Sequence, residues 1–207
     1  MAGIGKTALA IEYAHCYASH YDVVWWITAW TPAIIKKHLL DLAQALGLMN
    51  RSNDIESAVP RLCGVLQDRS RWLLIYDGVE DPDVLADLLP SGGGHVLITS
   101  RFPWWGELAV AVPVGLFEPD ESAALLLKRI PRLSLGDAER IAEAVDNLPL
   151  AVAQAAAYLD ETGLPADQYL RSLEGGCCPR PGPRSGAGSR SAEWLPDVFC
   201  RHLPAGL

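Results

Sequence analysis

The chain has 207 residues, half of them hydrophobic, which is enough for one domain of ordinary size plus part of another. Its formal net charge of −8 argues against direct binding to nucleic acid or to an anionic membrane surface, because no basic face offsets it. No run approaches the roughly 18 apolar residues of a membrane span and no secretory leader is recognisable, so we expect a cytoplasmic protein.

The chain begins with a glycine-rich segment that is typical of a phosphate-binding loop. Residues 3–7 (GIGKT) match the second half of the G-x-x-x-x-G-K-[ST] pattern, whose first glycine would fall one residue before Met1. In such loops backbone N–H groups hold the phosphates, the Lys reaches the β- and γ-phosphates and the Thr hydroxyl binds Mg²⁺. The alternative interpretation is a glycine turn before a helix, so the motif needs support from the rest of the chain.

Alternating helical and strand-like stretches follow the loop, which is the mark of a parallel α/β sheet. Uninterrupted apolar runs predict strands that are buried on both faces of the sheet, at residues 23–27, 72–76 and 95–99. A further run, Val110–Val114, predicts a last or edge strand. Apolar side chains at helical spacing predict helices around these strands, at residues 8–19, 31–46, 54–67 and 83–89.

Two charged residues follow predicted strands at the carboxyl ends, where open α/β sheets bind ligands. Asp77 ends the second strand and is placed to hold Mg²⁺ through water, although a helix or turn cap before Pro82 is the alternative. Arg101 follows the third strand, where a guanidinium can reach a terminal phosphate. By itself Arg101 is equally well a solvated loop residue.

From Glu118 onward the pattern becomes entirely helical. The predicted helices cover residues 120–130, 134–145, 149–160 and 165–173. Acidic residues near the first two starts complement helix N-termini. The chain therefore divides into a P-loop nucleotide-binding α/β domain at 1–115, truncated at its start, and a helical subdomain at 116–174.

The remaining segment, residues 175–207, has a different composition. It contains six Gly and five Pro without any periodic pattern, and its four Arg and two acids give it a charge of +2, against −10 for the first 174 residues. Such a segment cannot bury enough apolar area to offset its chain entropy. It is either a disordered linker or an out-of-frame gene end, and its abrupt start favours the second interpretation.

The order of these pieces resembles the NB-ARC nucleotide-binding domain of the STAND class of P-loop switch ATPases, and the bacterial branch that carries helical repeats looks closest. The matching stretches are residues 1–12, 21–29, 71–82, 92–101 and 147–159. The last of them holds the Leu-Pro-Leu core of the Gly-Leu-Pro-Leu motif, with Asn147 in place of its glycine. Their joint order is far more specific than any one stretch.

The resemblance implies a P-loop NTPase fold: a parallel sheet with helices on both faces, whose first strand is missing here, followed by a partial all-helical subdomain. It implies that Mg²⁺ is bound by Thr7 and Asp77, that Arg101 senses the γ-phosphate, and that Pro149 packs near the adenine. Pro149 is equally well the first residue of a helix. The implied contacts with ADP or ATP are Gly3, Ile4, Gly5, Lys6, Thr7, Ala8, Arg101 and Pro149.

One departure from the family pattern bears on catalysis. Many relatives follow the aspartate at position 77 with a second acid, which acts as the base for the attacking water, whereas this chain has Gly78. Glu80 lies beyond the strand end and is not assigned that role. We therefore expect no catalytic residue and at most slow ATP hydrolysis, which a Gly78→Asp substitution should raise.

A second departure is the start of the chain. In the resembled fold, the strand before the phosphate loop lies between two others in the sheet. Without it, neighbouring strands would expose unpaired backbone groups and apolar side chains. We therefore expect the chain to be unstable or prone to aggregation.

Together these features predict a nucleotide-binding regulatory switch domain of a signalling or transcription-regulating ATPase, present as a fragment. In the intact relative, ADP holds a closed state and ATP favours an open one that self-associates, with protein partners bound through C-terminal repeats. The alternatives are a non-catalytic interaction scaffold or a decayed, inactive fragment. A metabolic P-loop kinase fits less well, because the helical part shows no acceptor site.

Overall fold

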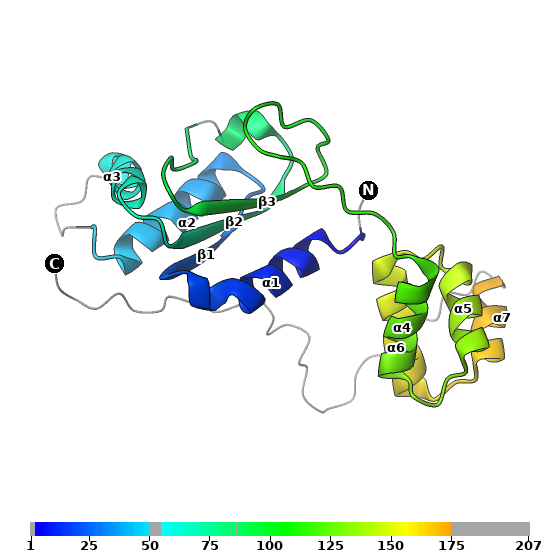
Figure 1. Ribbon diagram of the computed structural model, residues 1–207. Coiled ribbons are helices and arrows are strands. Elements are labelled where there is room, and N and C mark those ends of the chain that lie inside the picture. Colours follow the sequence, from blue (N-terminus) through cyan, green and yellow to red (C-terminus); the bar gives the residue numbers. More distant parts are fainter. Residues whose placement is uncertain (1–2, 50–54, 86, 175–207) are drawn as a thin grey trace. The chain divides into compact units, whose positions relative to one another are not determined.

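The computed structural model describes residues 3–49, 55–85 and 87–174 of the chain (Figure 1). These residues form two compact units, one of residues 6–112 and the other of residues 3–5 and 113–174. The first unit is an α/β structure and the second is helical. The segment 175–207, for which the sequence leaves two interpretations open, lies outside the described residues. No described helix has the length and apolar content needed to cross a membrane.

The sheet of the α/β unit consists of three parallel strands, β1 (Val23–Thr28), β2 (Trp72–Val79) and β3 (His95–Ser100). Their order is β1-β2-β3, so β2 is the central strand. All three follow from the apolar runs in the sequence, and they start at the predicted residues. Parallel strands need crossover connections, and between β1 and β2 this connection contains α2 (Pro32–Ala45) and α3 (Ile55–Gln67).

Helices cover both faces of this sheet, as predicted: α1 (Lys6–Tyr17) lies on one face, and α2 and α3 lie on the other (Figure 1). Alternate residues of β2 divide the two apolar cores, because successive side chains of a strand point to opposite faces. Leu73 and Ile75 pack with α1 residues such as Ala10. Trp72 and Leu74 pack with α2 and α3.

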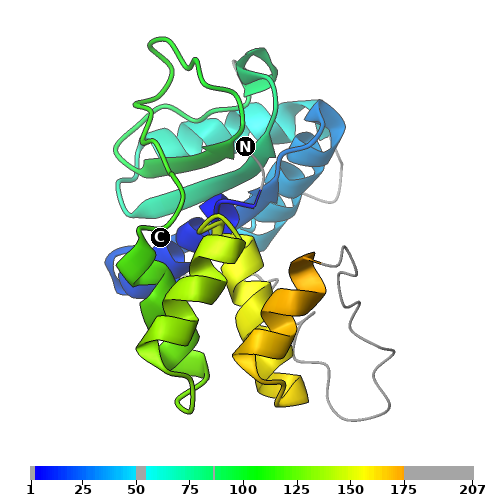
Figure 2. The same cartoon turned by 90° about the vertical axis from the view of Figure 1, so that its right-hand side faces the viewer.

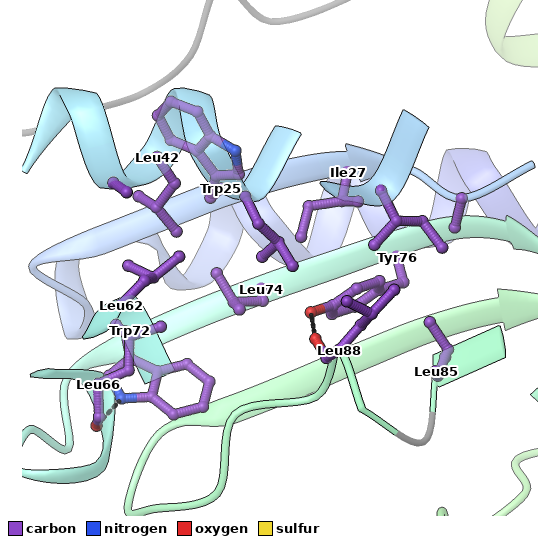
Figure 3. Close-up of a cluster of buried hydrophobic side chains, with 14 of the residues drawn as sticks. Trp25, Ile27, Leu42, Leu62, Leu66, Trp72, Leu74, Tyr76, Leu85 and Leu88 are labelled. Atoms are coloured by element: carbon purple, nitrogen blue, oxygen red, sulfur yellow. Dashed lines mark hydrogen bonds between the residues drawn. The ribbon is translucent and has the colours of Figure 1, made fainter. Parts of the chain in front are cut away.

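The core between the sheet and α2/α3 also satisfies its own polar groups (Figure 3). Trp72 Nε1 donates a hydrogen bond to the backbone oxygen of Leu66 at 2.8 Å, and Tyr76 Oη donates to that of Leu88 at 2.7 Å. Burial raises the pKa of the Tyr76 phenol. A buried carbonyl without a hydrogen-bond donor lowers the stability of the fold. These two side chains therefore stabilise the segments that lead into β2 and β3.

The third strand is less buried than the sequence predicts. Among the described residues β3 pairs with β2 alone, and its first two side chains are exposed, Val96 to 37 %. The prediction of a strand buried on both faces was wrong for β3. Within the described chain β1 also pairs on one side only but is largely buried, so burial depends on what packs over a strand and not only on its own residues.

The predicted strand Val110–Val114 is also wrong. These residues have no regular secondary structure, and Val110 and Val112 are strongly exposed. Apolar residues favour a strand only when another strand supplies pairing partners, and Pro113 has no N–H to contribute. The short helix predicted at 83–89 is reduced to a 3-10 turn, η2 (Pro82–Leu85).

The helical unit contains four helices, α4 (Pro119–Arg129), α5 (Leu135–Ala144), α6 (Pro149–Thr162) and α7 (Ala166–Glu174), seen in Figure 2. Their apolar faces share one core, which includes Leu126, Ile141 and Leu159. One of the predicted helix starts is capped by its own side chain. The Ser134 hydroxyl accepts a hydrogen bond from the backbone N–H of Asp137 at 3.1 Å, so it caps α5.

Candidate functional site

Three polar residues meet at the carboxyl ends of the strands of the α/β unit. Asp77 lies opposite Thr28 of β1 and opposite Thr99 of β3 in the register of the sheet. Asp77 is half-buried and Thr99 is buried. Open parallel sheets bind ligands at the carboxyl ends of their strands, so these residues lie where a ligand site is expected.

Two hydroxyl groups hold the carboxylate of Asp77. Thr7 Oγ1 donates a hydrogen bond to Asp77 Oδ1 at 2.8 Å, and Thr99 Oγ1 donates to the same oxygen at 2.6 Å. The Thr99 hydroxyl in turn accepts a hydrogen bond from the backbone N–H of Gly78 at 2.9 Å. The second carboxylate oxygen, Oδ2, makes no hydrogen bond within the described chain. The carboxylate is therefore oriented by its protein contacts, with one oxygen available to a ligand.

Thr7 reaches Asp77 because it is the second residue of α1, which begins at Lys6 directly behind the glycine segment. Gly3 and Gly5 have φ values of +78° and +86°, in the left-handed region that favours glycine. Ile4 between them is buried. The segment therefore has the backbone of a tight loop that leads into a helix N-terminus, where backbone N–H groups have no partners within the helix.

The glycine segment and the Leu-Pro-Leu stretch belong to the same compact unit. The backbone oxygen of Gly3 accepts a hydrogen bond from the backbone N–H of Leu150 at 3.1 Å. Pro149, the first residue of α6, is buried, and a Cβ added at Gly5 would lie 4.0 Å from the Pro149 Cβ. The proline is thus the first residue of a helix, and it also lies against the loop.

Arg101 follows β3, and its guanidinium donates a hydrogen bond to the carboxylate of Glu80. Both side chains are more than half exposed. An exposed ion pair contributes about 0–1 kcal/mol, so little free energy opposes an exchange of Glu80 for another anion. Ala8, another predicted contact, is an exposed residue in the first turn of α1.

Gly78 departs from regular strand geometry. It has φ +83°, and the pairing of β2 with β3 shifts between Asp77 and Val79, so Gly78 forms a bulge. A Cβ added at Gly78 would lie 2.9 Å from Trp30 Nε1 and 3.0 Å from Trp30 Cδ1. Position 78 therefore has a backbone conformation that favours glycine, and an exposed indole lies close to where a Cβ would be.

Neither Thr99 nor Trp30 was among the predicted site residues. Thr99 ends a predicted strand at the same edge as Asp77, so its contact could have been found by comparing the strand ends. The position of Trp30 could not, because it depends on the bulge at Gly78.

The oxygen ligands of this arrangement suit a hard cation. Mg²⁺ prefers carboxylate and hydroxyl oxygens and fills its remaining positions with waters and ligand phosphates. Thr7 Oγ1 lies 2.8 Å from one oxygen of the Asp77 carboxylate, and the other oxygen, Oδ2, has no hydrogen bond among the described residues, so one ion can be reached from both residues. The residues present therefore fit a Mg²⁺-phosphate ligand.

Comparison with known proteins gives a family match and two relatives. The family model of the NB-ARC domain matches residues 1–130. The chain is 27 % identical to a nucleotide-binding leucine-rich repeat (NLR)-like protein of Hyaloscypha variabilis, over 84 % of this chain and 20 % of that protein. It is 28 % identical to the disease resistance protein RPS5 of Arabidopsis thaliana, over 73 % of this chain and 19 % of that protein. The chain thus spans about a fifth of the length of these relatives.

Proposed function

Because the chain belongs to the NB-ARC domain family, we propose that it is the ADP- and ATP-binding switch domain of a larger signalling ATPase. The observation that carries this proposal is the hydrogen bond from Thr7, at the start of α1, to Asp77 at the end of β2. It joins the residue that would bind Mg²⁺ behind a phosphate loop to the carboxylate that would complete the ion's protein ligands. One relative is named as a nucleotide-binding protein, which supports the proposed ligand.

The proposal gives each site residue a separate task. The backbone of residues 3–8 and the Lys6 ammonium bind the phosphates, and Thr7 and Asp77 bind Mg²⁺. Thr99 orients the Asp77 carboxylate through its 2.6 Å hydrogen bond. Arg101 binds the terminal phosphate by leaving Glu80, and Pro149 packs near the adenine. Bound Mg²⁺ supplies positive charge that offsets the charge of the phosphates.

Hydrolysis in this site is slow at most. No acid follows Asp77, and Glu80 pairs with Arg101. Positioning and deprotonation of the attacking water are part of phosphoryl-transfer catalysis, and neither Gly78 nor its neighbour Val79 can provide them. The site is therefore built for binding and exchange of nucleotide.

A switch of this kind requires contacts that differ between ADP and ATP, because a ligand shifts an equilibrium only by its differential affinity for the two states. The exchangeable Arg101–Glu80 pair offers one such contact.

We place the α/β domain at residues 1–115 and the helical subdomain at 116–174. We also propose that ATP favours a self-associating state of the larger protein. The protein partners of the larger protein would bind outside this domain. We expect the protein to act in the cytoplasm, and we expect this domain to make no direct contact with nucleic acid or membrane.

Isothermal titration of the chain with Mg²⁺-ADP and Mg²⁺-ATP tests the proposal. Lys6→Ala and Asp77→Asn should each lower the affinity at least tenfold, and the unmutated chain should prefer ADP. Lys36→Ala is the matched control, because it removes the same charge from an exposed position on α2. Equal affinity of Lys6→Ala and the control would refute the site and favour a non-catalytic interaction scaffold.

A further inference from the structure

We propose that Glu80 is a specificity-determining residue, which competes with the terminal phosphate of ATP for Arg101 and thereby favours ADP. This inference rests on the proposed function and goes beyond it, because the carboxylate, and not only the guanidinium, then decides which nucleotide binds more tightly. It is carried by the ion pair between the Arg101 guanidinium and the Glu80 carboxylate.

The ends of β2 and β3 hold these two residues side by side. Val79 and Ser100 are the last paired residues of the two strands. Ser100 Oγ donates a hydrogen bond to the backbone oxygen of Val79 at 2.6 Å and accepts one from the backbone N–H of Phe102 at 2.9 Å. Glu80 and Arg101 are the residues that follow this pair, so their backbones are fixed next to each other and their side chains need little further ordering to meet.

Glu80 is the acid that pairs with Arg101 at this edge of the sheet. Asp77 Oδ1 is held by two threonine hydroxyl groups, and Asp81 Oδ1 accepts a hydrogen bond from the backbone N–H of Asp83 at 3.0 Å. Among the described acids of this segment, Glu80 alone forms an ion pair with Arg101. A phosphate that binds the guanidinium therefore has one defined carboxylate to displace.

The ion pair lies beside the proposed Mg²⁺ site. Thr99, whose hydroxyl donates to Asp77 Oδ1, is two residues before Arg101 in the chain. Two residues span at most about 7 Å even in an extended chain. The long side chain of Arg101 can therefore turn from Glu80 toward a phosphate that shares a Mg²⁺ ion with Asp77.

The competition follows from the chemistry of the two anions. A guanidinium binds carboxylate and phosphate oxygens through the same N–H groups. ADP has no γ-phosphate, so the pair between Arg101 and Glu80 stays intact when ADP is bound. ATP gains a contact with Arg101 only after Glu80 has left it, and the released carboxylate adds negative charge near the phosphates. Removal of the charge of Glu80 should therefore strengthen the binding of ATP and leave that of ADP unchanged.

Isothermal titration with Mg²⁺-ATP and Mg²⁺-ADP tests the inference in Glu80→Gln, which keeps the shape of the side chain and removes its charge. We expect the affinity for ATP to rise about two- to fivefold, a small factor because both side chains of the pair are exposed. The affinity for ADP should not change. No gain for ATP, or an equal gain for both nucleotides, would overturn the inference.

Asp81→Asn is the matched control for Glu80→Gln. It removes one charge from the neighbouring exposed residue, and it keeps the Oδ1 acceptor for the backbone N–H of Asp83. The control should leave the ratio of the ATP and ADP affinities nearly unchanged. A gain for ATP as large as that in Glu80→Gln would assign the effect to net charge and contradict the role of Glu80.

A second background separates competition for Arg101 from simple charge repulsion. In Arg101→Ala the guanidinium is absent, so Glu80→Gln should raise the affinity for ATP no more than Asp81→Asn does in the same background. If the full gain persists without Arg101, Glu80 acts by repulsion alone, and the inference is wrong.

The pair itself is tested by NMR of the chain without nucleotide. The Nε–Hε signal of Arg101 should shift in Glu80→Gln and stay in place in Asp81→Asn, and an unchanged signal in Glu80→Gln would show that the pair does not form. If the unmutated chain binds neither nucleotide, the proposed function is refuted, and the effect on ATP with it. If it binds both and Glu80→Gln leaves the ratio of their affinities unchanged, this inference alone is refuted.

Discussion

Thr99 fixes Asp77 from the neighbouring strand, because its hydroxyl donates to Asp77 Oδ1 and accepts from the backbone N–H of Gly78. A Thr99→Val substitution keeps the shape of the side chain but leaves that N–H without its acceptor. We expect the free energy of unfolding to fall by about 1–3 kcal/mol. Binding of Mg²⁺-nucleotide should also weaken, because the carboxylate loses one of its two orienting contacts. Urea denaturation and calorimetry measure the two effects.

Thr28→Val is the matched control for Thr99→Val. Thr28 also lies opposite Asp77, on β1, and its hydroxyl makes no hydrogen bond within the part of the chain that the structure describes. The control should leave both stability and nucleotide binding nearly unchanged. Similar losses in the two variants would contradict the role assigned to Thr99.

A second residue-scale prediction concerns Tyr21, which is 6 % exposed and contacts His95 Nδ1 at 2.9 Å and the Tyr13 hydroxyl at 3.3 Å. Burial, and then the Tyr13 contact, raise the pKa of Tyr21 to about 12, above the usual value of about 10. The pKa is higher in the folded state, so the stabilisation is complete below about pH 10 and is lost as the pH rises to about 12.

The urea midpoint of the chain should therefore fall between pH 9 and pH 11, and the fall should be smaller in Tyr21→Phe. Part of it should remain in that variant, because burial also raises the pKa of Tyr76. Tyr158→Phe, on α6 of the helical unit, is the control. A fall of the same size in Tyr21→Phe and Tyr158→Phe would show that Tyr21 is not responsible.

At the scale of elements, the link between α5 and α6 holds Asn147 in a backbone conformation that favours glycine. Asn147 has φ +51°, in the left-handed region, and its Oδ1 is buried without a partner among the described residues. Asn147→Gly should raise the free energy of unfolding by up to about 1 kcal/mol, because it removes both costs. Asn147→Ala should lower it by about 1 kcal/mol. Thermal unfolding of the two variants checks both signs, and a loss in Asn147→Gly would contradict this reasoning.

The strands show how far sequence predicts this fold. β1, β2 and β3 could be predicted because each is an apolar run that the sheet and its helices bury in part or in full. The exposure of β3 and the absence of a strand at Val110–Val114 could not, because the first depends on which segments pack over the strand and the second on pairing with another strand. Residue preferences describe which segments fit a sheet, and only the partner strand decides whether a sheet forms there.

The same distinction applies to the site. Asp77 could be predicted from its place at the end of an apolar run, and its contact with Thr7 agrees with the motif. Gly78 was interpreted only as the loss of an acid. Its positive φ and the indole beside it depend on the bulge in β2 and on the course of the chain after β1, which no local pattern reveals.

At the scale of the whole molecule, the open edge of β3 predicts self-association of the chain. Among the described residues β3 pairs on one side only, and Val96 is an exposed apolar residue on it. Unpaired N–H and C=O groups beside exposed apolar side chains are a template for pairing with another chain. We expect the chain to form larger species as its concentration rises.

Val96→Lys should reduce this association, because a lysine on an edge strand disfavours pairing with a second sheet. Light scattering over a concentration series measures the effect. Leu135→Lys is the matched control, since it adds the same charge at an exposed apolar residue of α5 and leaves β3 unchanged. An equal reduction in both variants would assign the effect to net charge. A chain that stays monomeric at all concentrations, with amide protection along both edges of β3, would show that this edge is not open in solution.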